Sequence, residues 1–279
     1  MSYAETFNNK VAVITGAASG LGMGFAQEIA RAGGTVVASD IDFEGVQKVV
    51  AGLGGDAEAH KLDVTDSGAV TKLVDDTVEK HGRIDFIFNN AGIAVQGYVE
   101  EIPIEDWDAI IDINLKGVAY GTSAAYRHMV KQGHGHIVNT ASLAGLTPAP
   151  LLSPYSTVKF GVVGMCDSLR VEAAPKGVTV TALCPGFIDT AIYDNARSTG
   201  FDNTKAKESI PGGIVPLDKG VRKLLDGVAK KKRVVTLPWF AHLLILGYKL
   251  TPNTSIKISS RMAAMQAKKA RIKSIQRGV

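Results

Sequence analysis

The sequence predicts an α/β fold in which a doubly wound parallel sheet of about seven strands carries helices on both faces. Two observations predict this fold. Short β-branched runs alternate with helix-length segments, and such alternation implies right-handed crossovers between parallel strands. Several of the runs, VAVIT and IDFIF among them, are almost continuously apolar, which is typical of strands that are buried on both faces.

Each expected strand is a short run rich in β-branched or apolar residues that lies between segments of helix length. The first run leads directly into a glycine-rich turn, and the second ends on an acidic residue. The expected strands span residues 11–15, 35–39, 59–64, 84–89, 136–140, 178–183 and 233–237.

The segments between the strands repeat apolar residues at helical spacing. Asp66 and Pro154 suit helix starts, because an Asp side chain accepts hydrogen bonds from first-turn N–H groups and proline fits the first helical turn. The expected helices span residues 21–32, 43–53, 66–81, 104–130 and 154–174.

Composition favours one catalytic domain in the cytoplasm. The 279 residues are 46% hydrophobic, enough for a sizeable core, and neither a secretory leader nor an apolar run long enough to span a bilayer is present. Cys166 and Cys184 lack metal-ligand spacing and suit reduced, buried thiols. His134 and His136 have no third ligand in view, so no metal is expected.

Charge is distributed unevenly along the chain. The net charge is +4, yet residues 219–279 contain 15 Lys or Arg and one acidic residue, whereas residues 1–218 contain 16 and 26. A segregation of this size indicates that the C-terminal segment meets something anionic.

Three glycines follow the first expected strand, in the turn Thr15-Gly-Ala-Ala-Ser-Gly-Leu-Gly22. Gly16, Gly20 and Gly22 would let the backbone approach a pyrophosphate at the positive end of the next helix. The alternative is a tight turn without a ligand.

Asp40 ends the second expected strand, about 20 residues after the glycines, where an acidic side chain can accept hydrogen bonds from the ribose hydroxyls of NAD. Neither Arg nor Lys stands at residues 17–19, 41 or 42 to neutralise a 2′-phosphate. The pattern therefore predicts NAD rather than NADP; the alternative is a solvated turn residue.

Tyr155 and Lys159 lie four residues apart near the start of an expected helix, so their side chains share one face. An ammonium group beside a phenol favours phenolate, which can exchange a proton with a substrate hydroxyl. Alone, such a pair would more often be a surface contact.

Together these motifs resemble the classical short-chain dehydrogenase/reductase family over about residues 8–190. TGAASGLG, Asp63-Val64, Asn89-Asn90-Ala91-Gly92, Asn114, Ser142, the Tyr155/Lys159 pair and Pro185-Gly186 occur in the family's order and spacing. The family often has two serines where this chain has Ala141-Ser142.

The resemblance implies a Rossmann fold and assigns roles to individual residues. Tyr155 would be the general acid/base, Ser142 would orient the substrate oxygen, Lys159 would lower the phenol pKa and hold the nicotinamide ribose, and Asn114 would anchor a relay water. Asp63 would face the adenine. The cofactor residues that the resemblance implies or the turn predicts are Gly16, Ser19, Gly20, Leu21, Gly22, Asp40, Asp63, Val64, Asn90, Ala91, Gly92, Tyr155, Lys159, Pro185, Gly186, Ile188 and Thr190.

Residues 188–216 are irregular and polar, and they stand where the family places its mobile substrate lid. Around the expected site, apolar residues favour a lipophilic secondary alcohol or ketone, since no Arg or Lys awaits an anionic substrate. These apolar residues are Val95, Leu143, Leu146, Leu151, Leu152, Phe187 and Ile192.

We expect a catalytic domain over residues 1–237 and a basic, partly apolar helical extension over residues 238–279. The apolar residues 237–250 are too few to span a bilayer, for which a helix needs about 20. They could lie in a membrane interface. Residues 256–276, which contain Met262, Met265, Ile272 and Ile275 among several Lys and Arg, suit an amphipathic helix on anionic lipid. An oligomer contact or a lid over the substrate cleft is the favoured alternative; no nucleic-acid motif is present.

The predicted function is therefore NAD-dependent interconversion of a secondary alcohol and its ketone, in the cytoplasm or peripherally at a membrane surface. A non-catalytic NAD-binding sensor or scaffold of the same fold is the alternative, and Asn114, Ser142, Tyr155 and Lys159 argue against it. The resemblance also implies a homodimer or homotetramer that pairs through residues 104–130 and 154–174.

Overall fold

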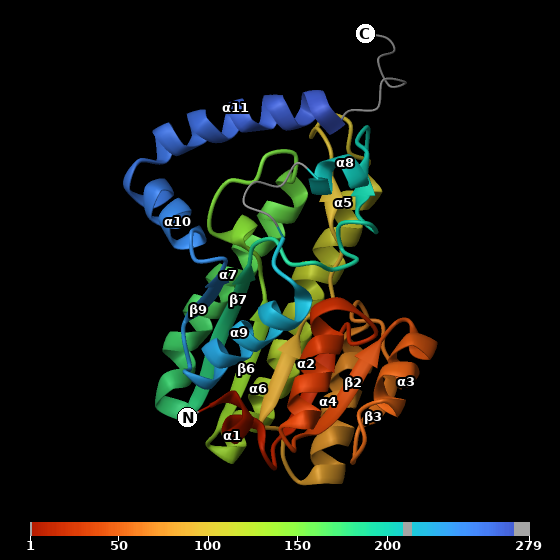
Figure 1. The fold of residues 1–279 in the computed structure, drawn as a ribbon. Helices are drawn as coiled ribbons and strands as arrows, with labels where there is room; N and C mark the ends of the chain where they lie inside the picture. Colours follow the sequence, from red (N-terminus) through yellow and green to blue (C-terminus); the bar gives the residue numbers. More distant parts are fainter. Residues whose placement is uncertain (1, 209–213, 271–279) are drawn as a thin grey trace.

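The computed structural model describes residues 2–208 and 214–270 and confirms the doubly wound sheet (Figure 1). Within these residues, seven parallel strands form one sheet in the order β3-β2-β1-β4-β6-β7-β9. The chain thus starts in the middle of the sheet and winds outward in both directions. The strands are β1 (Val11–Thr15), β2 (Thr35–Asp40), β3 (Glu58–Lys61), β4 (Phe86–Asn89), β6 (Gly135–Thr140), β7 (Val178–Pro185) and β9 (Val234–Leu237).

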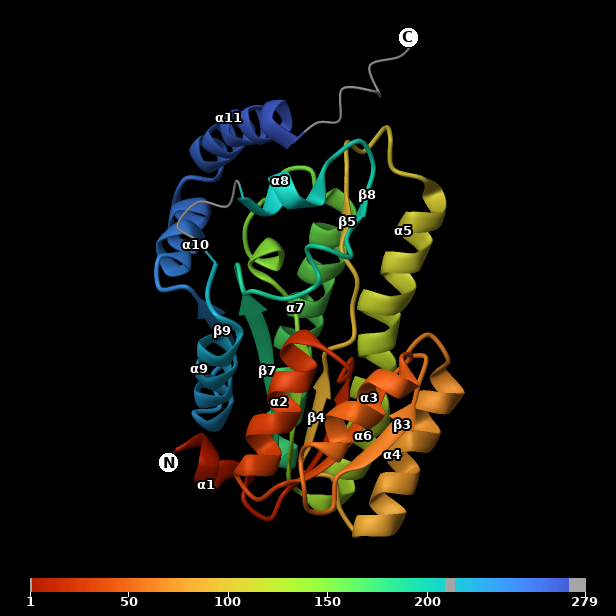
Figure 2. The ribbon, with the colours of Figure 1, turned by 45° about the vertical axis from the view of Figure 1, so that its right-hand side comes forward.

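Helices cover both faces of this sheet and form a separate apolar core on each side (Figure 2). One core packs α4 (Ser67–His81), α6 (Val118–Gln132) and α7 (Ser153–Ala173) against the strands. The other core contains side chains of α1 (Tyr3–Phe7), α2 (Gly20–Arg31), α3 (Phe43–Ala51) and α9 (Leu217–Ala229). Because both faces are covered, β1 and β4 are buried at every position.

Local sequence signals set several helix ends as expected. Asp66 caps α4 and accepts hydrogen bonds from the N–H groups of Gly68 and Ala69. Pro154 stands in the first turn of α7. The last helical turn of α4 is followed by Gly82, whose φ of 70° lies in the left-handed region that favours glycine.

The prediction of one continuous helix over residues 104–130 is wrong, because this segment consists of three parts. Between α5 (Ile104–Ile111) and α6, residues Asp112–Gly117 form a π-helix. The wider turn places the side chain of Asn114 in the interior, where it is fully buried. Single π-turns inside helices are frequent at functional sites.

Other boundaries and elements also differ from expectation. The third strand ends at Lys61, so Asp63 and Val64 lie beyond it, at the carboxyl edge of the sheet. Helix α9 was not among the expected helices, although its buried residues Val221, Leu224, Leu225 and Val228 repeat at helical spacing. Within the expected lid, β8 (Arg197–Ser198) pairs with β5 (Val95–Gln96), and α8 (Asn203–Glu208) follows; residues 209–213 lie outside the described part.

Two helices continue the chain after the last strand, as expected for the extension (Figure 1). Helix α10 (Ala241–Leu250) rises from the end of β9, and α11 (Pro252–Ala270) then crosses above the carboxyl ends of the strands. Ile272 and Ile275 lie outside the described residues. In the described part of the chain, no helix combines the length and apolarity needed to cross a membrane.

Candidate active site

The glycine turn lies between β1 and α2 and forms a close backbone cradle. A Cβ at Gly16 would stand 2.7 Å from Ala91 Cα, and one at Gly22 would stand 2.0 Å from Gly16 O. Gly16 and Gly20 also have φ values of 67° and 52°, which side chains rarely adopt. These positions therefore require glycine.

The N-terminus of α2 can receive an anion. The helix begins at Gly20, its N-cap residue Ser19 makes no side-chain capping bond, and its first turn has no acidic residue. Helix N-terminal N–H groups without a capping side chain, together with the helix dipole, suit a phosphate or pyrophosphate.

Asp40 lies at the end of β2 with its carboxylate fixed by the backbone. Its Oδ2 accepts a hydrogen bond of 2.9 Å from Ala18 N, and its Oδ1 accepts one of 3.0 Å from Asp42 N. Each carboxylate oxygen can accept a second bond, so the group keeps acceptor capacity for hydroxyls while presenting a negative charge.

Two asparagines hold the turn after β4. Asn90 Nδ2 donates to Thr15 O at 3.2 Å and to Gly16 O at 3.3 Å, which joins this turn to the glycine turn. Asn114 Oδ1 accepts from Ile93 N, and Asn114 Nδ2 donates to Ile93 O, both at 2.8 Å. The Asn114 side chain therefore positions the backbone that follows Gly92.

Tyr155 and Lys159 project from α7 toward the end of β6. Lys159 Nζ donates a hydrogen bond of 2.8 Å to Thr140 O and lies 5.5 Å from the centroid of the Tyr155 ring. Ser142 follows β6, and its Oγ accepts a bond of 3.2 Å from Ala144 N. Spacing along the helix and the strand end thus bring the three side chains together.

Burial controls the protonation of this group. Burial raises the pKa of Tyr155 to about 12, while a hydrogen bond with Ser142 acts in the opposite direction. Burial also lowers the pKa of Lys159 to about 8. Without ligand, the phenol is neutral at pH 7 and the ammonium is charged but desolvated.

A single cavity of about 1150 Å³ connects these parts. All of the expected site residues except Gly22 and Asn114 line this cavity. Gly22 packs against the backbone of Gly16, and the Asn114 side chain hydrogen-bonds the backbone of Ile93. The expected residues that line it are Gly16, Ser19, Gly20, Leu21, Asp40, Asp63, Val64, Asn90, Ala91, Gly92, Ser142, Tyr155, Lys159, Pro185, Gly186, Ile188 and Thr190.

Apolar side chains dominate the substrate end of the cavity, although uncharged polar residues such as Thr147, Asn195 and Asn203 also line it. Leu143, Leu151, Leu152, Phe187 and Ile192 line it as expected. Val95 does not line it but is buried in the core cluster against which Tyr155 packs, and Leu146 packs against a different core cluster. Among the described residues, Lys159 is the only Lys or Arg in the lining.

Several lining residues were not expected from the sequence. Tyr193 contributes a second buried phenol, whose pKa is raised by burial and by the neighbouring Tyr155. The C-terminal helices contribute more, since one side of α10 and part of α11 face the cavity. These residues are Phe240, Leu243, Leu244, Gly247, Tyr248, Thr251, Thr254, Ser255, Ile258, Ser259 and Ala270.

The described residues contain no cluster of three or more His, Cys, Asp or Glu suited to a metal. The fold and the side chains around Tyr155 instead define the class of protein as a Rossmann-fold oxidoreductase. The model of the short chain dehydrogenase family matches residues 10–200. The chain therefore belongs to the short-chain dehydrogenase/reductase family.

Known proteins with similar sequence or structure agree with this assignment. A 3-oxoacyl-(acyl-carrier-protein) reductase of Thermotoga maritima is 41% identical over 188 residues, which cover 66% of this chain and 76% of that protein. The cyclohexanol dehydrogenase of an Acinetobacter species is 40% identical over 190 residues, covering 67% and 76%. A Burkholderia phymatum short chain dehydrogenase/reductase, solved in complex with NAD, has a TM-score of 0.80 and 28% identity, covering 90% and 95%.

Proposed function

We propose that this protein is an NAD(H)-dependent oxidoreductase that interconverts a lipophilic secondary alcohol and its ketone. One observation carries the proposal: a single cavity is lined at one end by the glycine turn and Asp40, and further along by Ser142, Tyr155 and Lys159. A dinucleotide and a substrate bound in that cavity would meet at the reactive side chains.

The residues of the turn fit NAD. The N–H groups at the start of α2 would bind the pyrophosphate, and the fixed carboxylate of Asp40 would accept bonds from the adenosine ribose hydroxyls. A 2′-phosphate would be repelled by this carboxylate. The Burkholderia phymatum structure with NAD bound supports the same choice.

The residues around Tyr155 would carry out proton transfer. When bound, nicotinamide supplies the hydride acceptor or donor for the substrate carbon. Ser142 would hold the substrate oxygen, and Tyr155 would take the hydroxyl proton during oxidation or give one to the ketone oxygen during reduction. The charge on Lys159 favours the phenolate form of Tyr155, against the effect of burial.

The substrate class follows from the apolar end of the cavity. Leu243, Leu244 and Tyr248 of α10 line the same cavity as leucines of the segment that follows Ser142. No Arg or Lys of the described chain other than Lys159 lines the space. The relative named for cyclohexanol supports a cyclic or bulky secondary alcohol. In this proposal, residues 1–237 carry the chemistry, and residues 238–270 complete the substrate end.

A homo-oligomer is part of the proposal. Three exposed apolar side chains lie on helices expected at the family's subunit contact: Ile104 on α5 and Phe160 and Val171 on α7. Their exposure in the single chain favours a partner subunit over these helices. A homodimer would cover them.

The proposal is tested by adding NAD and a panel of secondary alcohols, from small polar ones to sterols, and following NADH absorbance. We expect turnover that favours bulky apolar alcohols and is lost in Tyr155→Phe while calorimetry still detects NAD binding. Equal turnover by Tyr155→Phe would contradict the proposed role, and NAD binding without turnover of any alcohol would favour a non-catalytic sensor.

A further inference from the structure

The most unusual surface of this molecule is the outer side of α10 and the start of α11. Of the fourteen large apolar side chains exposed among the described residues, eight lie between Trp239 and Met265. Soluble proteins rarely expose apolar side chains in such a cluster unless the cluster is a contact site. These eight are Trp239, Leu243, Leu244, Leu246, Leu250, Ile256, Ile258 and Met265.

Helix α10 is apolar on both of its long sides. Leu243, Leu244 and Tyr248 line the cavity, whereas Leu246 and Leu250 are not part of its lining and are 53% and 72% exposed. Only Ala241 of this helix is buried. Apart from His242 and Lys249, the helix is largely apolar, and apolar helix surfaces are ordinarily covered, so its outer side lacks a partner in the single chain.

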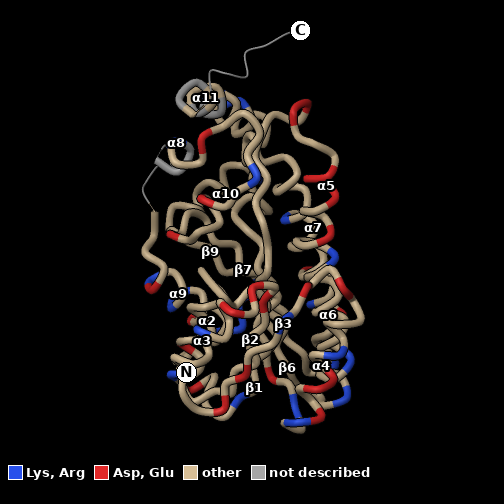
Figure 3. The backbone as a smooth tube through the Cα atoms, turned by 90° about the vertical axis from the view of Figure 1, so that its right-hand side faces the viewer, with Lys and Arg blue, Asp and Glu red and all other residues tan. Residues whose placement is uncertain are grey.

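The charged side chains of the C-terminal segment itself all have one sign. Residues 238–279 contain eight Lys or Arg and no Asp or Glu. Lys249, Lys257 and Arg261 are exposed on the two helices. Figure 3 shows that charged residues of both signs are more frequent along the lower half of the molecule than around α10. An apolar helix surface flanked by cations fits the interface of an anionic lipid bilayer.

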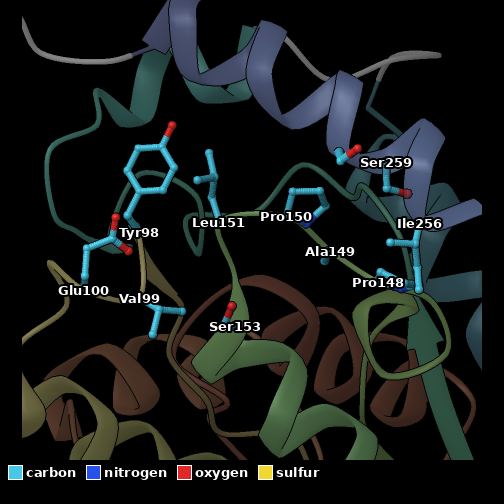
Figure 4. Close-up of a pocket in the computed structure, with 12 residues that line it drawn as sticks. Tyr98, Val99, Glu100, Pro148, Ala149, Pro150, Leu151, Ser153, Ile256 and Ser259 are labelled. Carbon is cyan, nitrogen blue, oxygen red and sulfur yellow. The ribbon is translucent and has the colours of Figure 1, made fainter.

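The helices are attached mainly at their two ends and leave space beneath them. Helix α10 follows β9 directly, and the far end of α11 packs Ala267 and Ala270 against Phe201, where Asp202 N donates to Ala270 O at 2.9 Å. A second cavity of about 470 Å³ lies under the start of α11, and Pro150 and Ser259 line both cavities (Figure 4).

The mouth of the main cavity lies at the same surface. Leu243, Leu244 and Ile258 line the cavity and are also at least half exposed, and Phe240 lines it while the adjacent Trp239 is 75% exposed. If α10 contacts a bilayer, an apolar substrate that leaves the lipid would therefore reach these leucines without crossing bulk water.

We propose that the outer surface of α10 and the start of α11 bind an anionic membrane surface, and that the lipophilic substrate enters the active-site cavity from that membrane. The proposed membrane contact rests only on the exposed apolar side chains and the cations of this surface. The entry route rests on the proposed function, because it requires a lipophilic substrate.

Tryptophan fluorescence tests the contact with little change to the protein. The chain has two tryptophans, Trp107 and Trp239, so Trp107→Phe leaves only the one on the proposed surface. Vesicles of equal parts phosphatidylcholine and phosphatidylglycerol should shift its emission to the blue, and lipids brominated on the acyl chain should quench it. Pure phosphatidylcholine should have a much weaker effect. An unchanged spectrum and no quenching with the anionic vesicles would overturn the proposal.

Sedimentation with the same vesicles provides the second test. The triple variant Trp239→Ser, Leu246→Ser, Leu250→Ser should bind at least about tenfold more weakly than the natural chain. Phe43→Ser, which removes an exposed apolar side chain on α3, should bind normally. Equal sedimentation of the triple variant would overturn the proposal, as would an altered oligomer mass with unchanged vesicle binding, which would assign the surface to a second copy.

Activity separates this proposal from the proposed function. None of the three substituted residues lines the cavity, so the triple variant should still oxidise a small water-soluble alcohol while losing turnover of an alcohol presented in vesicles. Vesicle binding without any alcohol turnover by the natural chain would overturn the proposed function and the entry route, and leave the membrane contact supported.

Discussion

Lys159 places its ammonium group 5.5 Å from the centroid of the Tyr155 ring, while its Nζ donates a 2.8 Å hydrogen bond to Thr140 O. Lys159 is only 3% exposed and Tyr155 is partly buried, between α7 and the end of β6. Charge interactions in such an environment are stronger than in water. Burial raises the proton affinity of the phenol and its hydrogen bond with Ser142 lowers it, and we expect the nearby Lys159 charge to lower it as well.

The pH profile of alcohol oxidation should report this pair. Because oxidation needs the phenolate and burial holds the pKa of Tyr155 near 12 without ligand, kcat/KM should rise with pH. Lys159→Met removes the cation and should move the inflection upward by about one pH unit or more. Lys176→Met is a matched control, because Lys176 makes the same type of contact with the Tyr126 ring. An unmoved inflection in Lys159→Met would contradict this account.

Lys159 should lower the free energy of unfolding of the protein without cofactor. Burial lowers its pKa from 10.5 to about 8, so below pH 8 the folded state holds a desolvated charge. Lys159→Met should raise the free energy of unfolding at pH 7 by about 1–3 kcal/mol.

This gain should depend on pH in a defined direction. Between about pH 8 and 10.5 the unfolded lysine binds a proton that the folded one has released, so the natural chain gains stability as pH rises. The advantage of Lys159→Met should therefore shrink across this range in urea unfolding at pH 7, 8, 9 and 10. A constant difference would show that Lys159 is not deprotonated in the folded state there.

Asp40 should decide between the two nicotinamide cofactors. Asp40→Asn keeps an acceptor for a backbone N–H group and removes the charge that repels a 2′-phosphate. The ratio of kcat/KM for NADP to that for NAD should rise about tenfold or more. Asp42→Asn is the control, since Asp42 caps α3 by accepting from Gly45 N and asparagine caps equally well. A ratio that changes equally in both variants would contradict the role of Asp40.

Helix α10 should contribute to substrate selection. Leu244→Ala removes an apolar contact at the substrate end of the cavity, and kcat/KM for a bulky alcohol should fall about tenfold. A small alcohol that does not reach α10 should be affected much less. Leu246→Ala, on the outer side of the same helix, should leave both substrates unaffected in solution. Parallel losses for bulky and small alcohols would point to a general loss of structure.

Local patterns were sufficient to predict the cofactor end of the site. The glycine turn, Asp40 at a strand end and the Tyr155/Lys159 pair on one helix face each depend on short-range geometry, and the parallel sheet aligns them at its carboxyl edge. Asn114 lies in a π-helix that the sequence did not reveal, because α- and π-helices differ only in which carbonyl accepts each bond.

The substrate end could not be predicted to the same degree. The apolar pattern of residues 237–250 suited a lipid surface, an oligomer contact or a lid, and it favoured the last two without deciding between them, because an apolar pattern does not identify what covers it. The position of α11, which follows α10, depends on contacts between distant parts of the chain, such as Phe201 with Ala267 and Ala270. Such contacts leave no periodic signal in a single sequence.

Transfer of a deuterium label tests the central claim most directly. A secondary alcohol deuterated at its carbinol carbon is incubated with the protein and NAD, and the reduced cofactor is analysed by mass spectrometry. The account predicts one deuterium on the nicotinamide ring with the natural chain and no reduced cofactor with Tyr155→Phe. Reduced cofactor without deuterium, or labelled cofactor formed equally by Tyr155→Phe, would contradict it.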